Sequence, residues 1–144
     1  MRFWDFPDSN IRNTPELRAR IAEAIAGLRP DLVVTCYSGH SWAPGAPNQR
    51  DHIEFAHAVA AAYDGLADPP AWLFECGPDP THCEVVDGYI EPAVASLAAH
   101  EVYLSVLDPD TPVVEQARRQ VEMSTPGRPE FGGRTVEFIL KRHR

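Results

Sequence analysis

The sequence lacks the short motifs that mark the common cofactor-binding and nucleophilic enzymes. It contains neither a G-x-G-x-x-G dinucleotide fingerprint nor a P-loop. It also contains no G-x-S-x-G turn, because Gly39-His40-Ser41 lacks the flanking frame that such a turn needs. Binding of dinucleotides or nucleoside triphosphates, and hydrolysis by an activated serine, are therefore poorly supported.

Basic residues are scarce. The chain has 13 Lys and Arg against 21 Asp and Glu, which gives a formal net charge of -8 at pH 7. A protein that binds the phosphate backbone of a nucleic acid normally presents a basic face. We therefore expect no nucleic-acid partner, and we interpret the short basic run 141–144 as a solvated terminus.

Cysteines are few, and long apolar runs are missing. The chain has three cysteines, Cys36, Cys76 and Cys83, and residues 1–5 do not resemble a secretory signal. An odd number of cysteines without a signal fits a reducing compartment. No apolar run approaches the ~18 residues of a membrane span. These observations predict a cytoplasmic protein without a membrane span.

What is present is the composition of an ordinary globular domain. The 144 residues are 44% hydrophobic and 24% charged, which suits a single domain over residues 1–144. Fourteen prolines lie mainly between the apolar segments, so they punctuate loops and do not indicate disorder.

Helix-like and strand-like segments alternate along the chain. The clearest helix begins after Asn13 or Thr14, either of which can cap it, and stops at Arg29-Pro30. Asn48 offers a cap for a second helix. The expected helices are 14–28, 49–63, 89–107 and 112–123, and the expected strands are 2–6, 32–37, 71–76, 83–87 and 135–140. This order predicts an α/β fold with a mostly parallel sheet and helices on both faces.

Two loops follow the carboxyl ends of expected strands, where such sheets bind ligands. The first loop is 7–10, and the second is 38–52. An aromatic ring, imidazoles and a carboxylate gathered in one loop are typical of a ligand site. Trp42 either stacks on the ring of a ligand or anchors the loop. The polar and aromatic residues of the second loop are His40, Trp42, Asn48, Gln49, Asp51 and His52.

Spacing alone gives no complete metal site. His52 and His57 lie roughly 140° apart on a helix of 3.6 residues per turn, so they cannot share one ion. The spacing of Cys76, His82 and Cys83 matches no zinc ribbon or finger. We interpret His57 as a helix-surface residue and the cysteines as buried or loop thiols.

Several segments resemble, in order and spacing, motifs of the LmbE-like (PIG-L) de-N-acetylases. The segment 28–35 resembles the family's helix-to-strand stretch, and Asn48-Gln49-Arg50-Asp51-His52 lies where the family carries His-Pro-Asp-His. The segment 6–9 is similar to the family's sugar-contacting turn. Residues 86–87 followed by 93–100 resemble its late strand and its A-L-x-x-H helix. The resemblance extends over about residues 2–107.

The resemblance implies a Rossmann-like, three-layer fold and zinc-dependent hydrolysis of N-acetyl groups from amino sugars. It implies His52 as a zinc ligand, Asp51 as the neighbouring catalytic residue and Asp8 as a substrate contact. Zinc with an open position lowers the pKa of bound water to ~7 and polarises the amide carbonyl. Gln49 replaces a histidine of the family motif; its amide can donate a hydrogen bond to the substrate but cannot become cationic.

The family's N-terminal His-Pro-Asp-Asp-type motif, which supplies two more zinc ligands and the general base, has no counterpart in this chain. Three alternatives stay open. The chain borrows ligands from His40, His100 or a partner; or it is inactive; or its true start lies upstream of Met1. The other hypothesis is that the chain is a non-catalytic sugar-binding or structural relative of the family. The fold is expected to be incomplete at the N-terminus, with an open sheet edge that favours homo-oligomers.

Overall fold

A computed structural model describes residues 4–144, which form two compact units. The first unit runs to His82 and includes Phe138–Arg144, and the second is Cys83–Glu137. Each unit is described separately below. The organisation of the chain as one domain stays a prediction.

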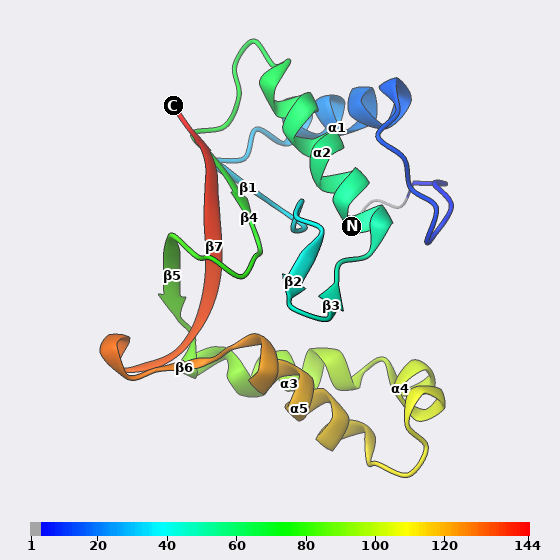
Figure 1. The fold of residues 1–144 in the computed structure, drawn as a ribbon, viewed down its shortest axis with the longest axis vertical. Helices are drawn as coiled ribbons and strands as arrows, with labels where there is room; N and C mark the ends of the chain where they lie inside the picture. The colour runs from blue at the N-terminus through cyan, green and yellow to red at the C-terminus, as the bar shows by residue number, and fades with distance from the viewer. Residues whose placement is uncertain (1–3) are drawn as a thin grey trace. The chain divides into compact units, whose positions relative to one another are not determined.

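The first unit contains two helices, several short strands and the end of a long strand (Figure 1). The last strand, β7 (Gly133–His143), contributes its carboxyl-terminal part to this unit. The other elements are α1 (Pro15–Leu28), β1 (Leu32–Thr35), β2 (Ser41–Ala43), β3 (Ala46–Pro47), α2 (Arg50–Asp64), β4 (Trp72–Glu75) and the start of β5 (His82–Val85).

Helix α1 begins and ends as its sequence predicts. The Thr14 hydroxyl accepts a hydrogen bond from the Leu17 amide at 3.2 Å, and Pro15 occupies the first turn, where its missing N–H costs nothing. Arg29 ends the helix in the left-handed conformation with φ 49°, and its N–H donates to the carbonyl of Ile25. The residues at helical spacing Leu17, Ile21 and Ile25 are buried, whereas Leu28 at the end of the helix is 67% exposed.

Helices α1 and α2 pack against each other and against one face of the sheet (Figure 1). Leu73 of β4 is 1% exposed and joins this core. Tyr63 is fully buried, and its hydroxyl donates to the Pro70 carbonyl, so the one polar atom of its ring is satisfied. Burying a side chain of this size contributes roughly 1.5–3 kcal/mol. The core residues are Leu17, Ile21, Ile25, Ala58, Val59, Ala62, Tyr63 and Leu73.

The main sheet is mixed. β1 pairs with β4 in parallel from Leu32↔Trp72 to Thr35↔Glu75, and β4 pairs with β7 in antiparallel, with a bulge after Leu73. The strand order is β1-β4-β7-β5, with β6 (Gly127–Arg128) antiparallel on β7. The expected α/β class is confirmed, but the mostly parallel sheet is wrong. Alternation of helices and strands gives the order of elements, whereas the final strand returns in the opposite direction.

Only one face of the first unit's sheet is covered by its helices. Along β1, Thr35 is buried, while Leu32 is 49% and Val34 is 45% exposed on the other face. The described residues of this unit therefore place helices on one face of the sheet and not on both. The strand expected at 2–6 is wrong in its described part, because residues 4–6 form no strand; Arg2 and Phe3 lie outside the described residues. Trp4 and Phe6 pack against the core of α1 and α2.

The second unit is mainly helical. Its core lies between α3, α4 and α5, and consists of Val94, Leu104, Ala117 and Val121. The helix expected at 89–107 is broken at Ala99–His100, where the His100 backbone adopts φ -82° and ψ 46°. Its elements are η1 (Asp87–Tyr89), α3 (Ile90–Ala98), α4 (Glu101–Leu107), α5 (Val113–Ser124), β6, η2 (Pro129–Phe131) and the first part of β7.

None of the helices in residues 4–144 combines the length and the apolar character that a membrane crossing requires.

Candidate functional site

The loop 36–49 leaves the carboxyl end of β1 and enters α2, where ligands bind in open α/β sheets. It contains a small antiparallel hairpin, β2 and β3, with the partners Ser41↔Pro47 and Ala43↔Ala46. Gly45 turns the hairpin at φ 79°, a conformation that favours glycine. The sequence did not predict the hairpin, because its strands are very short and exposed, and β3 contains a proline.

Asn48 holds this loop together. Its Nδ2 donates to the carbonyls of Tyr37 at 2.7 Å and Gly39 at 2.9 Å. Its Oδ1 accepts from Trp42 Nε1 at 3.2 Å and from the Gln49 amide at 2.9 Å. Asn48 was expected to cap α2, but Gln49 occupies the cap position, and Asn48 organises the loop before the helix.

Trp42 has a fixed orientation and an open surface. Its indole N–H is bonded to Asn48, and its ring lies against Tyr37 with the centroids 5.0 Å apart and the planes at 49°. The residue is still 39% exposed. An aromatic ring that is held at one edge and open at another offers a pre-oriented apolar contact surface for a ligand.

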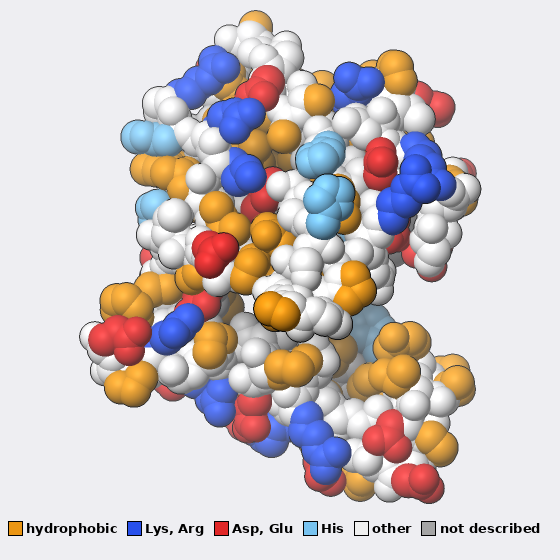
Figure 2. Space-filling model, viewed as in Figure 1, with side chains coloured by type: hydrophobic (Ala, Val, Ile, Leu, Met, Phe, Trp, Pro, Cys, Tyr) orange, Lys and Arg blue, Asp and Glu red, His pale blue; other side chains and the backbone are white. Residues whose placement is uncertain are grey.

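The other expected site residues in this region lie at the start of α2. Gln49 is exposed, and its side chain makes no capping bond. Asp51 is half-buried in the first turn, where a carboxylate interacts favourably with the helix dipole. His52 is exposed, and histidine side chains lie at the surface along α2 (Figure 2). The roles expected for these three side chains stay predictions.

Asp8 lies in a separate turn. The Asn10 amide donates to the Pro7 carbonyl at 3.3 Å, and Ser9 has φ 58°. Asp8 is exposed at this turn, and its expected contact with substrate stays a prediction.

The described residues do not fit the zinc site that the resemblance implies. Across residues 4–144, no group of three or more His, Cys, Asp and Glu side chains is arranged to hold a metal ion. His52 and His57 are both exposed on α2, and His40 is exposed in the loop. His100 belongs to the second unit, at the start of α4. We therefore derive no chemical step through zinc.

Sequence reasoning missed Glu75, which is only 2% exposed at the end of β4. Its Oε2 accepts from the Ser38 hydroxyl at 2.8 Å and from the Ser38 amide at 3.3 Å. Lys141 Nζ of β7 lies 3.3 Å from the same oxygen. A buried carboxylate is tolerated when it is paired and hydrogen-bonded. Glu75 therefore connects the start of the loop and the end of β7 to β4. A charged residue at the end of an otherwise apolar strand was the feature of the sequence that could have identified it.

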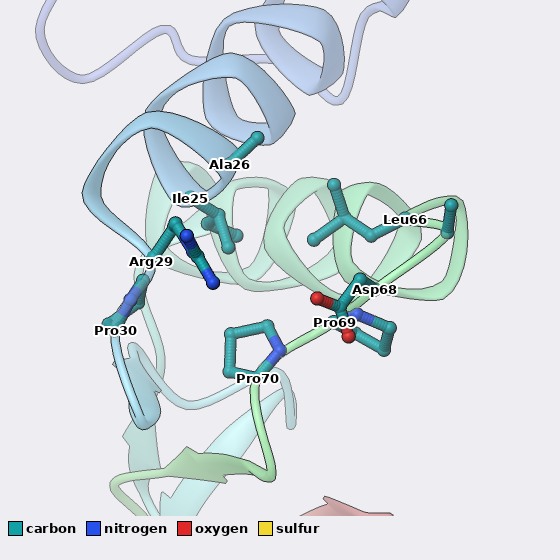
Figure 3. Close-up of a pocket in the computed structure, with 9 residues that line it drawn as sticks. Ile25, Ala26, Arg29, Pro30, Leu66, Asp68, Pro69 and Pro70 are labelled. Atoms are coloured by element: carbon teal, nitrogen blue, oxygen red, sulfur yellow. The ribbon is translucent and has the colours of Figure 1, made fainter.

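A hollow of the first unit lies at the opposite, amino ends of β1 and β4 (Figure 3). It has a volume of about 400 Å³ and lies between the ends of α1 and α2. Arg29 extends from the end of α1 toward the turn 68–70 (Figure 3). None of the expected site residues lines it. We prefer the loop 36–49 as the candidate site, because this hollow is open and lacks convergent catalytic groups.

The second unit has a shallower hollow of about 300 Å³, lined by Asp87, Arg128 and Arg134 among others. These side chains are already engaged within the unit. Arg128 Nε is 2.5 Å from Glu137 Oε1, and the Asp87 carboxylate accepts from the Arg134 amide at 3.3 Å. The hollow therefore offers few free groups to a ligand.

The protein is therefore an α/β protein with a mixed sheet, and its candidate loop lies at the carboxyl ends of β1 and β4. No family model and no curated protein matches the chain. Among solved structures, the chain is similar to the conserved protein TT1542 from Thermus thermophilus, with a TM-score of 0.67 and 21% identity. The likeness covers 96% of this chain and 64% of TT1542, so the chain spans less than two thirds of that protein. At this identity the likeness shows a shared fold.

Proposed function

We propose that this chain is a hydrolase-type domain resembling the amino-sugar de-N-acetylases, and that it binds an N-acyl amino sugar on the loop 36–49. The observation that carries the proposal is Asn48, which joins Trp42 and Gln49 at the carboxyl edge of β1 and β4. The Rossmann-like layering and the cytoplasmic location expected from the sequence belong to the same proposal.

The groups around Asn48 suit an acylated sugar. The open surface of Trp42 can cover the apolar face of a pyranose ring. The Gln49 amide makes no capping bond, so it is available to donate to the acyl oxygen. The start of the 15-residue helix α2 adds a partial positive charge near that oxygen. Together these groups would bind and orient the acyl group.

The proposal assigns binding and orientation to the described residues. Catalytic zinc sites use three protein ligands, and His52 is the one that the resemblance identifies here. Hydrolysis by this domain would need metal ligands beyond that histidine, as the resemblance itself implies.

Calorimetric titration with N-acetylglucosamine tests the binding. We expect weak binding by the wild type and at least a several-fold loss in Trp42→Ala, because stacking is removed. The matched control is Tyr103→Ala on α4, an aromatic side chain that is 65% exposed and outside the loop. Unacylated glucosamine should bind more weakly than the acylated sugar. Equal binding of both sugars, or no binding at all, would contradict the proposal.

A non-catalytic sugar-binding relative is the second candidate, and the single histidine at the expected metal position favours it. Acetate release from N-acetylglucosamine with added zinc separates the two. Release that is lost in His52→Ala supports a deacetylase. Sugar binding without any release supports the non-catalytic relative.

A further inference from the structure

Cys36 and Cys76 follow directly after the last paired residues of β1 and β4. The two strands run in parallel register, and their last pair is Thr35↔Glu75. The Cys76 amide donates to the Thr35 carbonyl at 3.1 Å, so the strands are still joined where the cysteines begin. The register therefore places the two cysteines opposite each other.

The two chain segments also remain together one residue further along. A Cβ atom placed on Gly77 would lie 2.9 Å from Cδ2 of Tyr37, so these two residues are in close approach. Cys36 and Cys76 are thus bracketed on both sides by residues that touch across the two strands.

This arrangement matches the geometry that a disulfide requires. Neighbouring strands lie ~4.7–4.9 Å apart, and disulfides join residues whose Cα atoms are roughly 4.4–6.8 Å apart. In a parallel register, opposite residues also point to the same face of the sheet. Both thiols are free and half-buried.

The electrostatics agree with this proximity. Burial raises the pKa of the Cys36 thiol, and the neighbouring Cys76 raises it further. Burial also raises the pKa of Cys76, with Glu75 adding to the effect. Charge on one thiol therefore disfavours charge on the other.

We propose that Cys36 and Cys76 form an oxidative modification site. A small disulfide such as oxidised glutathione oxidises the two thiols to a disulfide bond that links β1 to β4. One cysteine thiolate attacks a sulfur of the glutathione disulfide and releases one glutathione thiolate. The second cysteine thiolate then attacks the protein-bound sulfur of this mixed disulfide and releases the other glutathione. Two electrons pass to glutathione, and the two cysteine protons end on the two released thiols.

The bond would fix the beginning of the loop 36–49 to the strand beside it, since Cys36 is the first residue of that loop. The inference stands independently of sugar binding, because it uses only the register of β1 and β4 and the two thiols. In a reducing compartment, such a bond would be transient.

The experiment uses the full chain with Cys83→Ser, so that only the two cysteines of interest remain. The folded protein is treated with oxidised glutathione and digested with trypsin without reduction. We expect peptides 21–50 and 51–118 to be joined, and the intact mass to fall by about 2 Da as two hydrogens are lost. Reduction should restore both thiols. The variants that also carry Cys36→Ser or Cys76→Ser should take up one glutathione and form no link.

Unfolding in urea provides the control for chain flexibility. We expect the link to close at least about tenfold faster in the folded protein, because the register holds the thiols together. Two unlinked glutathione adducts, unreacted thiols in the folded chain, or equal rates in folded and unfolded chains would overturn the proposal.

Discussion

Glu75 is a charged side chain at a position where the surrounding strand is apolar and buried. Three groups from the loop and from β7 compensate the burial of its carboxylate. They are the hydroxyl and the amide of Ser38 and the ammonium of Lys141. Removing one partner leaves the carboxylate with fewer compensating bonds, and that loss usually exceeds the net value of the pair. Glu75 is therefore a sensitive point of the first unit.

Replacing Lys141 with methionine should lower the free energy of unfolding by about 1.5–3 kcal/mol, because the Glu75 carboxylate loses its cation. The same replacement in a Glu75→Gln background should cost clearly less, because no charge is left to compensate. Urea denaturation of the four proteins measures the difference. A cost that is equal in both backgrounds would show that the ion pair does not stabilise the fold.

Replacing Asn48 with alanine should loosen the loop, because four hydrogen bonds end on this side chain. We expect the fluorescence of Trp42 to change and hydrogen exchange of residues 37–49 to increase. Asn48→Asp is the matched variant, because it keeps the acceptor for Trp42 and loses the two donors. Unchanged exchange in both variants would rule out Asn48 as the organiser of the loop.

At the scale of elements, α2 and β7 are joined at their ends by Asp64 and Arg142. Arg142 Nε lies 3.0 Å from Asp64 Oδ1, and Nη2 lies 2.9 Å from Oδ2. The hydrogen bond from Arg142 lowers the pKa of Asp64. A carboxyl whose pKa is lower in the folded state stabilises the fold above its unfolded pKa of about 3.9, and this contribution is lost as the pH falls through the folded pKa.

Replacing Asp64 with asparagine should therefore lower the free energy of unfolding at neutral pH and have little effect in strong acid. The side chains of Arg142 and Asp64 are 43% and 47% exposed, so solvent screening keeps the loss below about 1 kcal/mol. Urea denaturation at neutral pH and below about pH 3 measures both values. An equal loss of unfolding free energy at both pH values would show that the charge of Asp64 does not stabilise the fold.

In the second unit, Arg134 supports the end of α5. Its Nη1 donates to the carbonyls of Glu122 at 3.1 Å and Thr125 at 2.8 Å, which the helix leaves without partners. Replacing Arg134 with methionine should cost about 1 kcal/mol and speed hydrogen exchange in the last turn of α5. Arg119→Met, on the same helix, is the control. Equal effects of the two changes would contradict this role.

Local patterns predicted the helices better than the sheet. Apolar spacing and the cap at Thr14 located α1, and the same spacing located α2 and α5 within two residues at either end. The break at Ala99–His100 has no glycine or proline to mark it. The direction of β7 depends on its pairing with β4, which lies more than sixty residues earlier in the chain, so no local pattern can predict this direction. Strand direction is a long-range property, and the expected parallel sheet failed for that reason.

At the scale of the molecule, the sequence located the candidate loop but not its internal structure. The gathering of polar and aromatic residues after β1 was visible in the sequence, since they are close along the chain. The buried Glu75 and the pair Cys36 and Cys76 were not, because their partners come from distant segments. The role of Asn48 was not visible either, because its hydrogen bonds depend on how the loop folds back on itself. The resemblance in sequence and the likeness to TT1542 extend over most of the chain, while no three potential metal-binding side chains come together in residues 4–144.

The central claim, that the loop 36–49 binds an N-acyl amino sugar, is tested most directly by nuclear magnetic resonance of the indole N–H groups. The chain has three tryptophans, so the Trp42 signal can be assigned with Trp42→Phe. During titration with N-acetylglucosamine, the account predicts a saturable shift of the Trp42 signal and little change at Trp72. Shifts that are absent, unsaturable or equal at both tryptophans would contradict it.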